Sequence, residues 1–439
     1  MQPIRTSRGF SRRIWGAAPA LALAVLAGLA GRPAQAADLA FSSGALAPIE
    51  EAQKMRTVIL KDYPGKVEFL PDQPPALLTR VRAELEGNAH VSSVLGANHG
   101  DLATLVPSGA LLPLDDLAAA LASRGFAPDL LKMGRLGTEH QLYIPWMQAT
   151  YFMVANKKAL PYLPAGADIN ALTYDQLRQW GEAMQKATGK RMVGFPAGPT
   201  GLMHRFFEGF LLPSYTGGVV TTFKSAEAER GWSEFAALWK TVTPNSTSIN
   251  FMQEALLNGD VWVGFDHVAR LLGALEKQPG DFVTFPAPAG PKGRGWMPVV
   301  VGLSVLKGAP DAEGARKLIG YLTQPSTALV TAREVGFFPT VNAPLPPDLS
   351  PGLKLAVSAI AATGGAKDAV GALLPIGLGA KGGEFDKVFL DTFQRIVIRG
   401  EPVRATLDRQ GEALQRIMNE TNAPCWQPDP VSTGACQVK

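Results

Sequence analysis

Serine, histidine and aspartate are the residue types in this chain that could do chemistry, but their spacing matches no catalytic or metal-binding motif. The five histidines are scattered without ligand spacing, and neither a G-x-S-x-G nor an H-E-x-x-H sequence occurs. Residues 377–382 spell a dinucleotide-binding pattern, yet Pro375 interrupts the preceding segment and no strand, turn and helix surround it. We therefore expect no catalysis, no cofactor and no metal.

Polar residues that follow expected strands are better candidates for binding a ligand. In parallel α/β sheets, ligands bind beyond the carboxyl ends of the strands. The candidates chosen in this way are Ser42 and Ser43 after residues 39–41, Asn98, His99 and Asp101 after residues 91–95, and Asp266 and His267 after residues 261–265. Ser42 and Asp101 have a second interpretation as N-caps of the helices that follow.

The elements that must position these residues alternate between strand and helix. Strands are predicted at residues 39–41, 67–70 and 91–95, with a helix at about 75–86 between the last two. This alternation predicts a parallel sheet covered by helices on both faces. Two strand-like segments, 143–146 and 151–156, then follow each other without a helix, as expected where a chain leaves one lobe for another. The strand at 261–265 is expected to carry the chain back.

The first 36 residues are predicted to be an export signal. Four arginines precede an apolar run at residues 17–30, and residues 34–36 (AQA) offer a cleavage site after Ala36. Residues 11–15 (SRRIW) also resemble a twin-arginine signal, so both export routes stay open. Because no cysteine at the cleavage site could be acylated, we expect the protein to be retained in a Gram-negative periplasm.

The remaining composition points to a globular protein of two domains. About 400 mature residues exceed what one hydrophobic core usually serves. The formal charge is +4, and removal of the five arginines of the signal leaves a value near −1, with no basic stripe for nucleic acid. Cys425 and Cys436, the only cysteines, should form a structural disulfide in an oxidising compartment.

Seven segments, in order, resemble the extracellular solute-binding proteins of carbohydrate-uptake ABC transporters, the group that includes maltose- and glycerol-3-phosphate-binding proteins. The segments are 109–117 (GALLPLDDL), 140–146 (HQLYIPW), 154–158 (VANKK), 172–177 (LTYDQL), 257–262 (LNGDVW), 285–291 (FPAPAGP) and 336–339 (GFFP). The sequence departs from the family pattern at residues 139–141, at Ile144 and at residues 154–155. These departures lie near the expected crossing between lobes.

The resemblance implies an α/β fold of the class II periplasmic binding protein type, with two discontinuous lobes that close about a hinge. Crossings are expected near Trp146, Gly264 and Leu322. The expected parts are the signal at 1–36, the N-terminal lobe at 37–145 and 264–321, and the C-terminal lobe at 146–263 and 322–439, which ends in the disulfide-closed tail. A monomer that docks on membrane permease subunits is expected.

The resemblance also implies a sugar-like ligand, and sugars need planar side chains for stacking and polar side chains for hydrogen bonds. The stacking candidates are Trp146, Trp296, Phe337 and Phe338; the further polar candidates are Gln148 and His204, with Gly302 in the strand after Trp296. Two other interpretations stay open. One is a non-sugar solute such as a polyol phosphate, and the other is a secreted carbohydrate-active enzyme that uses Asp101 and Asp266 as its two carboxylates.

Overall fold

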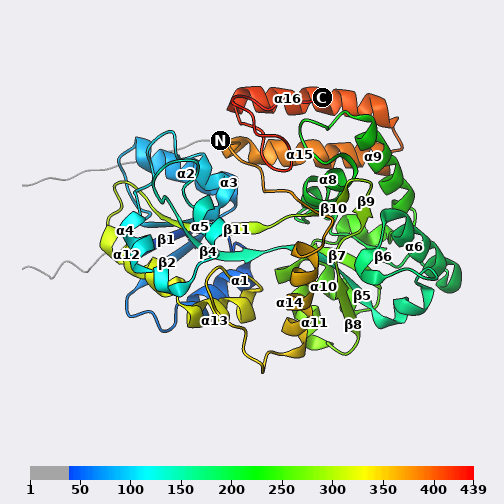
Figure 1. Cartoon of the computed structure of the whole chain (residues 1–439), viewed down its shortest axis with the longest axis horizontal. Helices are drawn as coiled ribbons and strands as arrows, with labels where there is room; N and C mark the ends of the chain where they lie inside the picture. The colour runs from blue at the N-terminus through cyan, green and yellow to red at the C-terminus, as the bar shows by residue number, and fades with distance from the viewer. Residues whose placement is uncertain (1–38) are drawn as a thin grey trace, which may run out of the picture. The chain divides into compact units, whose positions relative to one another are not determined.

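The computed structural model describes residues 39–439, so the expected export signal lies outside the described residues. Within this region the helices and strands gather around two main sheets, coloured mostly blue, cyan and yellow on the left of Figure 1 and green, orange and red on the right. We call the first group of elements the first lobe and the second group the second lobe.

The first lobe is built on a six-stranded sheet in the order β12-β4-β11-β3-β1-β2. β1, β2 and β3 are parallel, whereas β11 runs antiparallel to both β3 and β4. The strands are β1 (Leu39–Ser43), β2 (Val67–Pro71), β3 (Val94–Asn98), β4 (Ile144–Ala149), β11 (Val299–Val305) and β12 (Phe338–Pro339). The helices are α1 (Ile49–Lys54), α2 (Pro74–Glu86), α3 (His99–Ala103), α4 (Asp115–Ala120), α5 (Pro128–Met133), α12 (Ala312–Leu322) and α13 (Pro325–Val335).

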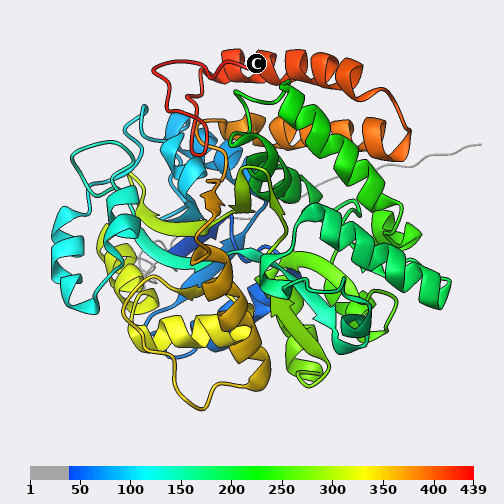
Figure 2. The same ribbon diagram turned by 45° about the vertical axis from the view of Figure 1, so that its right-hand side comes forward.

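The second lobe is built on a four-stranded sheet in the order β6-β7-β5-β8, beside a small sheet in the order β13-β10-β9. Its strands are β5 (Tyr151–Asn156), β6 (Val193–Gly194), β7 (Val263–His267), β8 (Phe282–Phe285), β9 (Ala289–Gly290), β10 (Gly293–Trp296) and β13 (Ala369–Gly371). Its α-helices are α6 (Tyr174–Thr188), α7 (Met203–Phe206), α8 (Leu212–Thr216), α9 (Ala226–Trp239), α10 (Met252–Leu257), α11 (Val268–Lys277), α14 (Pro351–Gly364), α15 (Gly382–Phe393) and α16 (Val403–Thr421). α15 and α16 run across one end of the lobe, as both views show (Figure 1 and Figure 2).

The chain passes between the two main sheets at places that differ in part from those expected. The first passage, at Thr150 between β4 and β5, is close to the crossing expected near Trp146. The expected return near Gly264 falls inside β7, which pairs with β5 and β6 in the second sheet. The return occurs instead just before β11, and the last passage follows β12 rather than Leu322. The apolar pattern of β7 specified a buried strand but not the sheet to which it belongs.

Three further features concern the disulfide, membrane spans and metal sites. The disulfide between Cys425 and Cys436 is confirmed, and it closes the tail that follows α16. No helix of the described region combines the length and apolar character needed to cross a bilayer. In the same region, no group of three or more His, Cys, Asp or Glu side chains is arranged to hold a metal ion.

Candidate binding cleft

A cavity of about 450 Å³ lies between the lobes, within the size range of small-molecule sites. The first-lobe wall consists of residues 44–48 and 73–75, Glu51, Asn98, Gly100 and Asp101. The second-lobe wall consists of Leu202, His204, Arg205, His267, Arg270, Leu374, Pro375, Leu378, Gly379, Gly382, Gly383 and Asp386. The rest of the lining comes from segments near the passages between the sheets and consists of Tyr151, Val299, Val301 and Phe337.

Five of the residues predicted from the sequence line this cavity: Asn98, Asp101, His204, His267 and Phe337. They come from both lobes and are brought together by strand ends and short helices, as the strand-end rule anticipates. The other predicted residues lie outside the lining, for reasons that differ from one to the next.

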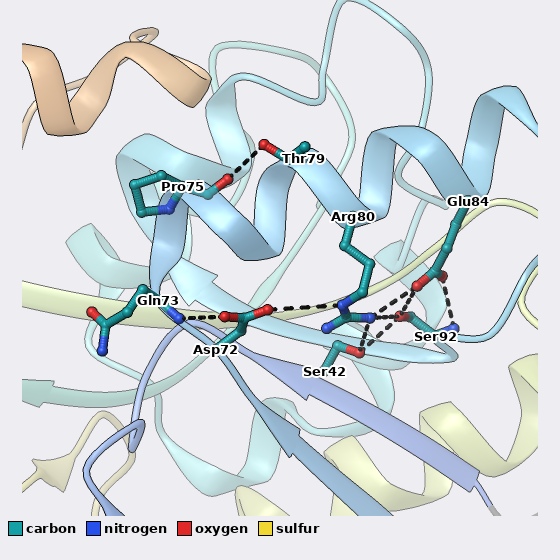
Figure 3. Close-up of polar contacts among 8 residues, drawn as sticks. All are labelled: Ser42, Asp72, Gln73, Pro75, Thr79, Arg80, Glu84 and Ser92. Carbon is teal, nitrogen blue, oxygen red and sulfur yellow. Dashed lines mark hydrogen bonds and ion pairs between the residues drawn. The ribbon is translucent and has the colours of Figure 1, made fainter. Parts of the chain in front are cut away.

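Ser42 and Ser43 belong to β1 itself and are fully buried. The Ser42 hydroxyl lies 2.7 Å from the Ser92 hydroxyl and accepts from the Arg80 guanidinium at 3.2 Å, and Arg80 in turn is paired with Glu84 (Figure 3). Ser43 Oγ accepts the Ala45 N–H at 3.1 Å and so holds the turn into the first-lobe wall. Both serines therefore hold residues of the first lobe in place and are not part of the cavity lining.

His99 and Gly302 pack on Tyr143 instead of facing the cavity. His99 Nδ1 lies 3.0 Å from the Tyr143 hydroxyl, and burial lowers the pKa of this histidine to about 4. A Cβ on Gly302 would lie 2.3 Å from the Tyr143 ring. Glycine is therefore needed in β11 so that this ring can cover the strand.

The two predicted tryptophans are also outside the lining. Trp146 is 1 % exposed and packs edge-on against Phe41 at 5.6 Å, in the core of the first lobe. Trp296 lies in β10, next to Gly364 and Gly371. Trp146 is therefore a core residue, and Trp296 is a half-buried residue that packs against the core.

Strand alternation separates two further predicted pairs, because successive side chains point to opposite faces. In β7, His267 lines the cavity, whereas Asp266 is buried and accepts the Met252 and His267 N–H groups at 3.0 and 2.7 Å. Phe337 lines the cavity, whereas Phe338 pairs with β4 opposite Gln148, whose amide donates to the Pro339 carbonyl at 2.9 Å. The two carboxylates of the enzyme interpretation, Asp101 and Asp266, therefore do not share the cavity.

The first-lobe wall carries two carboxyl groups whose pKa values burial raises. Burial raises the pKa of Glu51 to about 7, although Arg270 and Lys54 lower it. Burial likewise raises the pKa of Asp101 to about 6, and the Asn98 amide donates to its Oδ2 at 3.3 Å. Carboxyl groups of this kind can donate as well as accept hydrogen bonds near neutral pH.

The second-lobe wall is centred on Arg205, which is not among the residues predicted from the sequence. Arg205 Nη1 lies 2.7 Å from Glu208 Oε2 and 3.6 Å from Asp386 Oδ1. Burial lowers the pKa of Arg205, but Asp386 and Glu208 outweigh that effect and raise it. Glu208 is 1 % exposed, and burial raises its pKa well above the usual range. The guanidinium is therefore paired with two acids, one of which is fully buried in the fold.

Two histidines complete this wall, and both are neutral. His204 Nε2 lies 3.5 Å from Asp386 Oδ2, while burial lowers the pKa of His204 to about 4. His267 Nδ1 accepts the Ala269 N–H at 3.3 Å as the N-cap of α11, and burial lowers its pKa to about 3. Its Nε2 then carries the proton and can donate to a ligand.

A glycine-rich segment, residues 374–383, brings the second-lobe wall against the first lobe. A Cβ on Gly100 of α3 would lie 1.8 Å from the Pro375 carbonyl oxygen, and a Cβ on Gly379 would lie 2.6 Å from the Arg82 guanidinium. Gly379 also has a φ of +54°, a conformation that favours glycine. The glycines of residues 377–382, whose spacing matches a dinucleotide-binding pattern, therefore allow the two lobes to approach each other closely.

Comparison with known proteins shows which proteins this chain is similar to. The family described as bacterial extracellular solute-binding protein matches residues 37–328, and no curated protein matches the chain in sequence. Among solved structures, maltose-bound MalE3 of T. maritima has a TM-score of 0.70 at 18 % identity, covering 87 % of this chain and 99 % of that chain.

Two other solved structures are similar over comparable lengths. UgpB from Mycobacterium tuberculosis, in complex with glycerophosphocholine, has a TM-score of 0.68 at 18 % identity and covers 87 % of this chain and 98 % of that one. An ABC transporter solute-binding protein from Agrobacterium vitis S4, with bound D-mannitol, has a TM-score of 0.69 at 15 % identity, with coverages of 88 % and 99 %. The predicted two-lobe α/β fold is thereby confirmed.

Proposed function

Because this chain belongs to the family of bacterial extracellular solute-binding proteins, we propose that it binds a sugar or sugar-like solute in the cavity between its lobes and delivers it to the membrane subunits of an ABC importer. The observation that carries the proposal is the cavity itself, whose polar side chains come from both lobes. A solute held by both walls favours the closed arrangement of the lobes, which is the form that docks.

The chemistry of the lining suits a neutral, hydroxyl-rich solute. Glu51, Asp101 and Asp386 accept hydrogen bonds from hydroxyl groups, and Asn98 and His267 can donate to them. Arg205 is already paired with Asp386 within its own wall, and the other arginine of the lining, Arg270, donates to two backbone carbonyls, so the two do not form the arginine cluster that a phosphate favours. Tyr151 and Phe337 supply the apolar surface that a sugar ring packs against.

The proposed role is transport without chemical change of the solute. Export to the periplasm, cleavage after Ala36 and docking of a monomer on permease subunits are parts of the same proposal. They are supported by the basic and apolar order of residues 1–36 and by the family to which the chain belongs.

A ligand screen on the protein from residue 37 onward tests the function. We expect a panel of sugars, polyols and polyol phosphates to contain a sugar or polyol that raises the melting temperature, with about 2.7 kcal/mol of stabilisation at a hundredfold excess over Kd. Calorimetry should then give saturable binding that Asp101→Ala weakens and the exposed control Glu313→Ala leaves unchanged. Tight binding of phosphates alone, or conversion of the sugar to products, would overturn the proposal.

A further inference from the structure

A second hollow of about 440 Å³ lies on the second lobe. It runs along α10, and most of its lining is polar. We call it the α10 groove and define it by Thr200, Asn245, Asn250, Gln253, Glu254 and Asn258.

Arg270 connects the cavity to the α10 groove. The side chain lines the cavity, and its Nη1 donates to the carbonyl oxygens of Thr200 and Asn250 at 3.2 Å each. Both of these residues line the groove. The Thr200 N–H in turn donates to Asn250 Oδ1 at 2.9 Å, which fixes the two segments that flank the junction. The two hollows therefore share a rigid border.

The border also contains an exposed aromatic ring. The Arg270 guanidinium carbon lies 4.3 Å from the centre of the Phe251 ring, and Phe251 is one of the few large apolar side chains in residues 39–439 that is more than a third exposed. Phe251 also lines the groove. A guanidinium held by carbonyls and an aromatic face keeps its place without a carboxylate partner, so the border is formed before any ligand arrives.

We propose that the α10 groove is an additional carbohydrate subsite, so that the solute is an oligosaccharide that extends from the cavity over Arg270 and Phe251. This inference rests on the proposed function. The part of Phe251 that Arg270 leaves exposed packs against the C–H face of a sugar ring. The amides of Asn245, Gln253 and Asn258 both donate to and accept from its hydroxyls. Glu254 adds a carboxylate that can accept from a hydroxyl group.

Chain length is the variable that tests the subsite. The probes are two purified series of one to six glucose units, one α-1,4-linked and one β-1,4-linked, measured by calorimetry on the mature protein. In the series that binds, affinity should rise as the oligomer grows past the length that fills the cavity. Phe251→Ala should remove that rise and weaken the longest oligomer about five- to tenfold, while the shortest binding member changes less than about twofold.

Ile398→Ala is the matched control, because Ile398 is similarly exposed, at 42 %, and lines neither hollow. A second variant, Asn258→Ala, removes one amide of the groove without touching Arg270 and should also weaken only the longer oligomers. Flat affinity beyond the shortest binding member, or equal losses at all lengths in Phe251→Ala, would overturn the subsite and leave the proposed function standing. Absence of binding by every sugar, here and in the wider panel, would overturn both.

Discussion

The two walls of the cavity are built differently. The first-lobe wall consists of turns and short helices that follow strand ends. In it, glycine and backbone approach the site closely, and Glu51 of α1 and Asp101 of α3 have few partners. The second-lobe wall presents helical side chains that rest on a dense aromatic cluster. Phe206, Phe210 and Phe265 pack within 6.3 Å of one another directly behind Arg205.

This difference indicates how each wall responds to change. On the first-lobe wall, the groups that face the cavity contribute little to the fold, so changes there should act on binding. On the second-lobe wall, Arg205 neutralises acids that are buried in the fold, so changes there should reduce stability as well. Four experiments test this contrast.

The largest effect is expected behind the first-lobe wall, at Trp146. Replacement by alanine leaves a cavity beside Phe41 and should lower the free energy of unfolding by about 3 to 5 kcal/mol. Urea unfolding followed by circular dichroism measures this. Since Trp146 is outside the lining, ligand affinity of the folded fraction should be unchanged; a large loss of affinity would place the ring in the site after all.

The second experiment removes the central cation of the second-lobe wall. Arg205→Met should lower the free energy of unfolding by about 3 kcal/mol at pH 7, because Glu208 and Asp386 lose their counter-charge. We expect the lower end of the usual range because Glu208, with its raised pKa, can take up a proton.

The companion change Glu208→Gln in the Arg205→Met background should restore about half of that loss. On the first-lobe wall, Asp101→Asn should change stability by less than about 1 kcal/mol, because it replaces a poorly solvated carboxyl group by an amide. Equal losses from Arg205→Met and Asp101→Asn would contradict the contrast between the walls.

The third experiment tests the close approach of the lobes. Gly100→Ala places a methyl group against the Pro375 carbonyl and should weaken ligand binding by about 1 to 3 kcal/mol while the melting temperature of the free protein stays within a few degrees. Calorimetry with the solute found in the screen measures the change. Gly320→Ala, where an added Cβ meets open space, is the control. Unchanged affinity in Gly100→Ala would mean that this contact is dispensable for closure.

The smallest effect is a pH dependence at Glu51. Because burial raises its pKa to about 7, the folded protein holds a proton there that the unfolded chain releases at lower pH, and stability falls as pH rises from about 4.5 to 7. The free energy of unfolding of Glu51→Gln should therefore exceed that of the parent by about 1 to 2 kcal/mol at pH 8 and match it near pH 4. A difference that is the same at both pH values would show that Glu51 has an ordinary pKa.

Much of the fold could be predicted from the sequence because local patterns specify it. β1, β2 and α2 lie within a few residues of their expected positions, since each has a clear apolar period and clear ends. β7 was recognised as a buried strand, but its sheet was not, because the partner of a strand is decided by residues more than a hundred positions away.

The candidate site was only partly predictable. Asn98 and His267 are the last residues of β3 and β7, and Asp101 lies three residues beyond β3. The end of a strand is a signal that a single sequence contains. Arg205 and Asp386 are 181 positions apart and meet only through the packing of α7 against α15. The side toward which Trp146 points depends on strand register, and a shift of one residue reverses it. No local pattern settles either question.

One further consequence concerns the irregular helix that holds Arg205. Residues 203–216 form a continuous helical stretch with a π-helical turn at Phe207–Leu211, where the Leu212 N–H donates to the Phe207 carbonyl. Such a turn amounts to one residue inserted into an α-helix. Loss of a single codon within it would rotate His204 and Arg205 by about 100° relative to Ser214. The orientation of two cavity side chains therefore depends on the length of this turn as well as on the amino acids of the lining.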